Sequence, residues 1–187
     1  MSQNTTEEIL TSLKAGAPLP DYSEMTFSAP RELIDSLAKR IDSFPDTEKI
    51  NKKLEKERAH AKKKGIPFDE AALRAELEQS CFLSRNKFAT MANINPSHLT
   101  QFLNGPAKGE KEKGMSRDRL LSIFITLGMD ISEINEYLRK FDGIDTLHAR
   151  IKRDYMIMVG IEKHLALDEI DQLLQEHHLD GLENFNK

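Results

Sequence analysis

The chain has 187 residues, a formal net charge of −4 and a single cysteine. One cysteine excludes an internal disulfide framework and leaves no cysteine pair for zinc, so we expect a reduced intracellular compartment. Residues 1–10 lack the basic and apolar regions of a signal peptide, and no apolar run approaches the roughly 20 residues of a membrane span. We therefore expect a cytoplasmic protein without a membrane partner.

The charge is distributed unevenly along the chain. Residues 46–119 carry 16 Lys and Arg against 11 Asp and Glu, whereas the two ends of the chain are acidic. A basic central region is typical of a module with one phosphate-facing side, although a charged solvated surface gives the same pattern.

The N-terminal region contains two predicted helices separated by a proline-rich linker. Thr5 and Glu8 have the spacing of a capping box at the start of a helix over residues 5–15. A second helix begins near Pro30, and we interpret residues 1–45 as a helical arm. Its apolar stripe has helical spacing and consists of Leu33, Ile34, Leu37 and Ile41.

Residues 46–64 form a predicted helix with few apolar contacts, supplied by Ile50, Leu54 and some alanines. Such a helix projects into solvent or lies along a partner. Its last turn holds three lysines, residues 62–64, which either contact phosphate or form a solvated helix end. Residues 65–68 then break the helix, and we treat residues 46–68 as one segment.

Two short helices joined by a tight turn are predicted at residues 85–104. Ser84 and Asn95 are suited to cap them, and Pro96 occupies the first position of the second helix, where its missing N–H costs nothing. Asn93 lies where the turn requires a left-handed residue, and Asn substitutes best for glycine there. The predicted core of this corner contains Phe88, Ala89, Ala92, Ile94, Leu99, Phe102 and Leu103.

The outer face of the second helix is uncharged. A short helix that exposes only such hydrogen-bonding groups is suited to read base edges in a major groove. A buried helical corner without nucleic acid is the alternative. The residues of this face are Ser97, His98, Thr100, Gln101 and Asn104.

The segment INPSHLTQFLNG, with the spacing of Ala89, Asn93, Leu99 and Phe102, resembles the helix-turn-helix of lambda-repressor-like, XRE-type bacterial regulators. The resemblance implies an all-α fold built on a compact five-helix domain, which we assign to residues 69–142.

Three further helices are needed to complete that domain. The first is expected to follow Asp69, and the last two to follow the capping residues Ser116 and Asp130. The first helix is predicted to pack into the domain through Ala72, Leu73, Leu77, Cys81 and Phe82. A lysine-rich loop, GPAKGEKEKGM, precedes Ser116 and looks longer than the loop of that family.

A weak internal repeat links the end of this domain to the C-terminal region. Without gaps, RDRLLSIFITLGMDISEINEYL aligns with RDYMIMVGIEKHLALDEIDQLL at an offset of about 36 residues. Residues 143–187 are therefore interpreted as a helical hairpin extension that stacks on the fifth helix, because a repeat unit cannot bury its own apolar face. Chance similarity between amphipathic hairpins is the alternative.

No catalytic or cofactor-binding pattern is found in the sequence. The six histidines show no paired metal-ligand spacing, and there is no P-loop, GxGxxG or GxSxG motif. We expect neither an enzyme nor a bound cofactor or metal.

The leading hypothesis is a transcriptional regulator that binds double-stranded DNA as a two-fold dimer, with helix 96–104 in the major groove. The segment from Phe88 to Gly105 holds no Asp, Glu, Lys or Arg, so this helix alone would bind weakly. A protein-interaction adaptor on the same fold is therefore the main alternative, and an RNA or single-strand binder is a lesser one. The expected phosphate ligands are Arg85, Lys87, Lys108, Lys111, Lys113, Arg117 and Arg119.

Overall fold

The computed structural model describes residues 26–182 except 28, 106–113 and 142. The helix predicted at residues 5–15 and the lysines Lys108, Lys111 and Lys113 lie outside the described residues. The described chain is mostly helical, which confirms the all-α prediction. Its helices are α2 (Arg31–Asp42), α3 (Thr47–Lys64), α4 (Glu70–Glu78), α5 (Arg85–Met91), α6 (Pro96–Asn104), α7 (Arg117–Thr126), α8 (Ile131–Arg139), α9 (Lys152–Glu162) and α10 (Leu167–Glu176).

The α5–α6 corner has the local chemistry that the sequence predicts. The side chain of Ser84 accepts a hydrogen bond from the N–H of Lys87 at the start of α5. The side chain of Asn95 accepts from the N–H groups of Ser97 and His98, which caps α6. Asn93 adopts a φ of 55°, the left-handed conformation that turns the chain between the two helices. The predicted core side chains of this corner are all buried.

The helix that packs on this corner is α2, and not the helix predicted to follow Asp69. Leu37 and Ile41 of α2 are completely buried in one cluster with Phe88 of α5 and Leu99 of α6. Helix α2 thus shares one core with α5, α6, α7 and α8, and we name these helices the central bundle. Two predicted boundaries are therefore corrected. Helix α2 is not part of an N-terminal arm over residues 1–45, and the bundle does not begin at residue 69.

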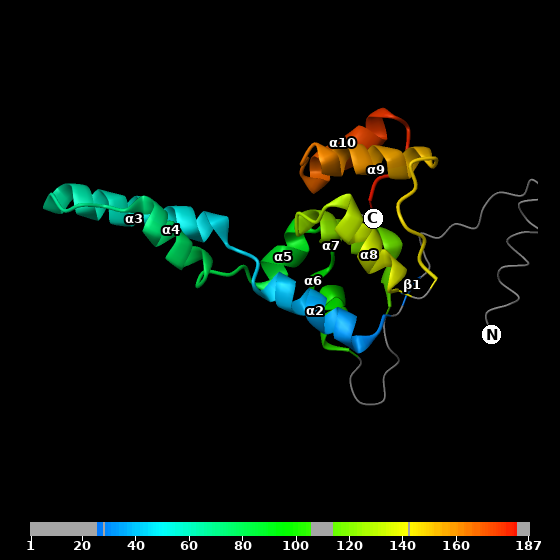
Figure 1. Ribbon diagram of the computed structural model, residues 1–187, viewed down its shortest axis with the longest axis horizontal. Coiled ribbons are helices and arrows are strands. Elements are labelled where there is room, and N and C mark those ends of the chain that lie inside the picture. Colours follow the sequence, from blue (N-terminus) through cyan, green and yellow to red (C-terminus); the bar gives the residue numbers. More distant parts are fainter. Residues whose placement is uncertain (1–25, 28, 106–113, 142, 183–187) are drawn as a thin grey trace, which may run out of the picture.

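Helices α3 and α4 form a separate hairpin that extends away from the bundle (Figure 1). Their apolar side chains pack on each other in a small second cluster that includes Ile50, Leu54, Leu77 and Cys81. Of the predicted inner face of α4, Leu73, Leu77 and Cys81 pack in this cluster, whereas Ala72 and Phe82 are exposed. Each helix carries only a narrow apolar stripe, so burial of one stripe against the other removes both from water.

The two ends of the α3–α4 hairpin lie side by side, where it joins the bundle. The N–H of Leu83 donates to the carbonyl of Phe44 at 2.8 Å, and the N–H of Asp46 donates to the carbonyl of Cys81 at 2.9 Å. The hairpin is thus an insertion between α2 and α5 that leaves the packing of those helices uninterrupted.

A short antiparallel ladder closes the bundle near the start of α7. Strand β1 (Thr26–Phe27) pairs with β2 (Met115–Ser116). Gly114 allows this close approach, because a Cβ atom at that position would lie 2.7 Å from the carbonyl oxygen of Phe27.

The hairpins α7–α8 and α9–α10 stack on each other, as the internal repeat predicts (Figure 1). Each hairpin turns through a residue with positive φ, Gly128 in the first and His164 in the second. The capping box predicted for Asp130 and Glu133 is present at the start of α8. In the second hairpin Ala166 replaces the aspartate, and its N–H still donates to the side chain of Glu169 at 2.7 Å.

Candidate nucleic-acid interface

Helix α6 turns its apolar side inward and exposes the side that the sequence predicts. Ser97, Gln101 and Asn104 are exposed, whereas His98 and Thr100 are half-buried. Leu99, Phe102 and Leu103 hold the opposite side in the core, so the outer face of α6 is fixed in orientation by the packing of the inner one.

His98 is held by two neighbours at the edge of this face. Its Nδ1 lies 3.0 Å from Nη1 of Arg119, and its Nε2 lies 3.3 Å from the carbonyl oxygen of Gly114. Because a guanidinium only donates and a carbonyl only accepts, Nδ1 accepts and Nε2 carries the proton. His98, predicted to contact bases, and Arg119, predicted to bind phosphate, therefore bind each other and join α6 to α7.

Asn104 and Arg85 also contact each other. Nη1 of Arg85 donates to the side-chain oxygen of Asn104 at 2.8 Å. The other nitrogens of Arg85 form two hydrogen bonds with the carboxylate of Asp42, at 2.6 Å and 2.7 Å, and these bonds hold the pKa of Asp42 below its usual value. The guanidinium predicted to bind phosphate is thus balanced by a carboxylate.

Lys87, another predicted phosphate ligand, also forms an ion pair, and its side chain is more exposed than those of Arg85 and Arg117. Its Nζ lies 3.5 Å from a carboxylate oxygen of Asp46, and 57% of its side chain is accessible. The Asp46 side chain is only 7% exposed and also accepts from the N–H of Lys49 at 3.0 Å, so the exposed ammonium group of Lys87 is not its only partner and can turn to another anion.

The expectation that Arg117 binds phosphate is wrong. Its side chain is only 16% exposed and forms two hydrogen bonds with the carboxylate of Asp154, at 3.1 Å and 2.8 Å. It also donates to the carbonyl oxygens of Asp145 and Thr146. These contacts use its donors inside the protein.

Arg31 is a neighbour of α6 that the sequence analysis missed. Its Nη2 donates to the carbonyl of Leu103 at 2.7 Å and contacts Asp35, and about half of its side chain, 48%, is exposed. It lies beside Gly105, at the end of α6. No local signal identifies this position, because it depends on the packing of α2 against α6.

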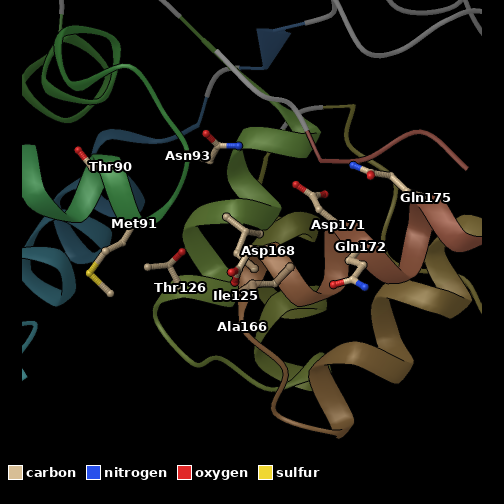
Figure 2. A pocket seen from close by; sticks show the side chains of 11 residues that line it. Thr90, Met91, Asn93, Ile125, Thr126, Ala166, Asp168, Asp171, Gln172 and Gln175 are labelled. Atoms are coloured by element: carbon tan, nitrogen blue, oxygen red, sulfur yellow. The ribbon is translucent and has the colours of Figure 1, made fainter. Parts of the chain in front are cut away.

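An open groove of about 870 Å³ lies on another side of the α5–α6 turn. Figure 2 shows Met91 and Asn93 at one edge and the α10 side chains Asp168, Asp171, Gln172 and Gln175 at the other. Burial raises the pKa of Asp171, and the negative charges of Asp118 and Asp168 add to this effect. Two carboxylates make the groove unsuited to phosphate and suited to a cationic or amide-bearing group.

Sequence analysis did not identify this groove. Its two edges are about 75 residues apart in the chain, and they meet only because the C-terminal hairpin stacks on α7. The described residues contain no group of three or more His, Cys, Asp and Glu side chains that could hold a metal ion. Among the helices described, none is both long and apolar enough to cross a membrane.

Comparison with models of protein families, with curated proteins and with solved structures gives no match to this chain.

Proposed function

We propose that this protein binds double-stranded DNA in a sequence-specific manner through the exposed face of α6. The observation that carries the proposal is that face itself: Ser97, Gln101 and Asn104 are exposed on a capped helix whose opposite side is completely buried. Uncharged hydrogen-bonding side chains on a rigid, short helix suit the donor and acceptor pattern of a major groove.

The bundle would then be a lambda-repressor-like helix-turn-helix domain whose first helix differs from the one that the sequence predicts. Its five helices would be α2, α5, α6, α7 and α8, with the α3–α4 hairpin inserted after the first. In this arrangement α6 lies in the major groove, and the amide of Gln101 forms two hydrogen bonds with an adenine. Arg85 orients the amide of Asn104 at the far end of the same face.

Affinity would depend on cations that flank α6. Among the described residues, the exposed cations beside α6 are Lys87 and Arg31. In the sequence, α6 is followed by three more lysines, Lys108, Lys111 and Lys113. Because few phosphates are neutralised by one such module, we expect a two-fold dimer on two half-sites about one helical turn apart.

A selection of binding sites from random duplexes tests the proposal. One short sequence motif should be enriched by the full chain, and its affinity should decrease steeply and linearly with the logarithm of salt concentration. Enrichment of no motif, or equal affinity for a selected and a scrambled duplex at every salt concentration, would contradict sequence-specific binding.

A second candidate function, that of a protein-interaction adaptor on the same fold, is favoured by a different observation. Arg85 and Arg117, expected to bind phosphate, are paired with Asp42 and Asp154, which reduces the positive charge near α6. The groove lined by Asp168 and Asp171 could hold a basic segment of a partner protein. The two functions are distinguished by Asp168→Lys, which should leave duplex binding unchanged and abolish capture of such a partner.

A further inference from the structure

The outer side of α9 is apolar and is partly exposed in the described part of the chain. Ile151 and Tyr155 are 51% and 50% exposed, and Met158 and Val159 are half-buried on the same side of the helix, with Met158 also packed against the main core. These positions follow helical spacing, so they form one stripe, which we name the α9 stripe. The opposite side of the helix is buried through Asp154, Ile157, Gly160 and Ile161.

The internal repeat shows how the equivalent side of α7 is used. At an offset of 36 residues, the α9 stripe corresponds to Met115, Arg119, Ser122 and Ile123. Met115, Ser122 and Ile123 are completely or almost completely buried, and Arg119 contacts His98 of α6. In the first hairpin this side packs against the rest of the protein, whereas in the second hairpin no described element of the chain covers it to the same extent.

The charges at the two ends of α9 are complementary to those of an identical antiparallel helix. Lys152 and Glu162 lie at equal distances in sequence from Ile157, one near each end of the stripe. If two α9 helices meet through the stripe about a two-fold axis that crosses the helix at the level of Ile157, Lys152 lies opposite the partner's Glu162, and Tyr155 lies opposite the partner's Val159. Such a contact is isologous, so it closes after two copies.

We propose that the α9 stripe is the surface through which a second copy of this chain docks, with the two α9 helices antiparallel. The proposal does not depend on DNA binding. It would provide the two-fold pairing that two half-sites require. One helix face is smaller than the ~800 Å² that a stable interface buries on each partner, so we expect a dimer that dissociates at micromolar concentrations.

Sedimentation velocity of the full chain over a wide concentration range tests the proposal without DNA. The wild-type protein should change from monomer to dimer as its concentration rises. Tyr155→Glu should weaken the dimer by at least about tenfold, because it places two like charges in the apolar centre of the contact. Ile66→Glu is the matched control, since Ile66 is equally exposed, at 51%, beyond the end of α3; it should leave dimerisation unchanged.

The charge pairs give a second test that does not depend on the loss of an apolar side chain. Lys152→Glu alone and Glu162→Lys alone should each weaken the dimer, and the double variant should restore it because the pair is then reversed. Circular dichroism establishes that each variant is folded. A wild-type protein that stays monomeric, a folded Tyr155→Glu variant that still dimerises, or a charge reversal without recovery would each overturn the proposal.

Discussion

Arg117 and Asp154 are joined by two hydrogen bonds that tie the first helix of one hairpin to the first helix of the next. The converse pair is also present, because Arg153 donates to both oxygens of Asp118 at 2.9 Å and 2.8 Å. The repeated Arg-Asp sequence thus forms a reciprocal exchange, from which we infer that α7–α8 and α9–α10 are related by an approximate two-fold axis.

Main-chain contacts extend this symmetry. Nε of Arg117 donates to the carbonyl of Asp145, and Nε of Arg153 donates to the carbonyl of Asp180. Each arginine therefore fixes the segment that follows one hairpin as well as the aspartate of the other. We infer that the C-terminal hairpin is an integral part of the bundle, since its first helix supplies half of these contacts.

The first prediction concerns this exchange. Arg117→Ala should lower the free energy of unfolding by about 3–5 kcal/mol, because it leaves the carboxylate of Asp154 buried, at 3% exposure, without its charge partner. Urea unfolding followed by circular dichroism measures the change. Arg58→Ala is the matched control, because Arg58 is paired with Glu70 on an exposed surface and should cost less than about 1 kcal/mol.

A double-mutant cycle separates the pair from the general effect of truncation. Arg117→Ala combined with Asp154→Ala should lower the free energy of unfolding by clearly less than the sum of the two single changes, because each single variant leaves one charge without its partner and the double variant leaves none. Additive losses would mean that the two side chains stabilise the protein independently, in conflict with the reciprocal exchange.

Local features of the fold could be predicted from the sequence, whereas the choice of packing partners could not. Caps, prolines and left-handed positions act within a few residues, so Asn93 and Asn95 were identified correctly. Helices α2 and α4 both carry an amphipathic stripe, and nothing within either stripe indicates which one meets α5 and α6. The insertion of α3–α4 moved the correct partner, α2, far from the corner in sequence.

The same distinction applies to the candidate site. Exposure of Gln101 follows from helical periodicity, so it could be predicted. The pairing of Arg85 with Asp42 and of Arg117 with Asp154 joins residues 43 and 37 positions apart. A count of basic residues near α6 therefore overestimated the positive charge available to phosphate.

The second prediction concerns the turn of the α5–α6 corner. Asn93→Ala should destabilise the protein by about 1–2 kcal/mol, because alanine meets a steric cost at a φ of 55° that Asn93→Gly avoids. Chemical denaturation of both variants measures the difference. Asn86→Ala, at an exposed helical position of α5, should be close to neutral. Equal losses for alanine and glycine at position 93 would show that the side chain matters and the backbone conformation does not.

The third prediction concerns the charge of Asp171. Its Oδ1 accepts a hydrogen bond from the N–H of Leu182 at 2.6 Å, and in the first hairpin the amide oxygen of Asn135 accepts from Leu147 in the same way, at 2.7 Å. The negative charge is therefore not needed for this contact. Asp171→Asn should keep the hydrogen bond and remove a half-buried carboxylate from the groove.

The pH dependence of that variant has a definite sign. Burial raises the pKa of Asp171 in the folded state, so the folded protein binds more protons than the unfolded chain between the ordinary pKa and the raised one. The contribution of the Asp171 carboxyl to the free energy of unfolding therefore decreases as pH rises through that interval. The melting temperature of Asp171→Asn relative to wild type should increase from acidic to neutral pH. A difference that is constant with pH would show that this carboxyl titrates alike in both states.

The last prediction addresses DNA recognition. On the selected duplex, Gln101→Ala should weaken binding by about 1–3 kcal/mol and relax the preference for one base pair, because it removes an amide that can form two hydrogen bonds with adenine. Lys87→Ala should instead weaken binding to all duplexes alike and reduce the salt dependence. Fluorescence anisotropy with selected and single-substituted duplexes measures both effects. Gln172→Ala provides the control, since it removes the same amide group from α10, at the groove and away from α6. If Gln172→Ala and Gln101→Ala weaken binding equally, or if Gln101→Ala leaves base preference unchanged, α6 is not the element that reads the sequence.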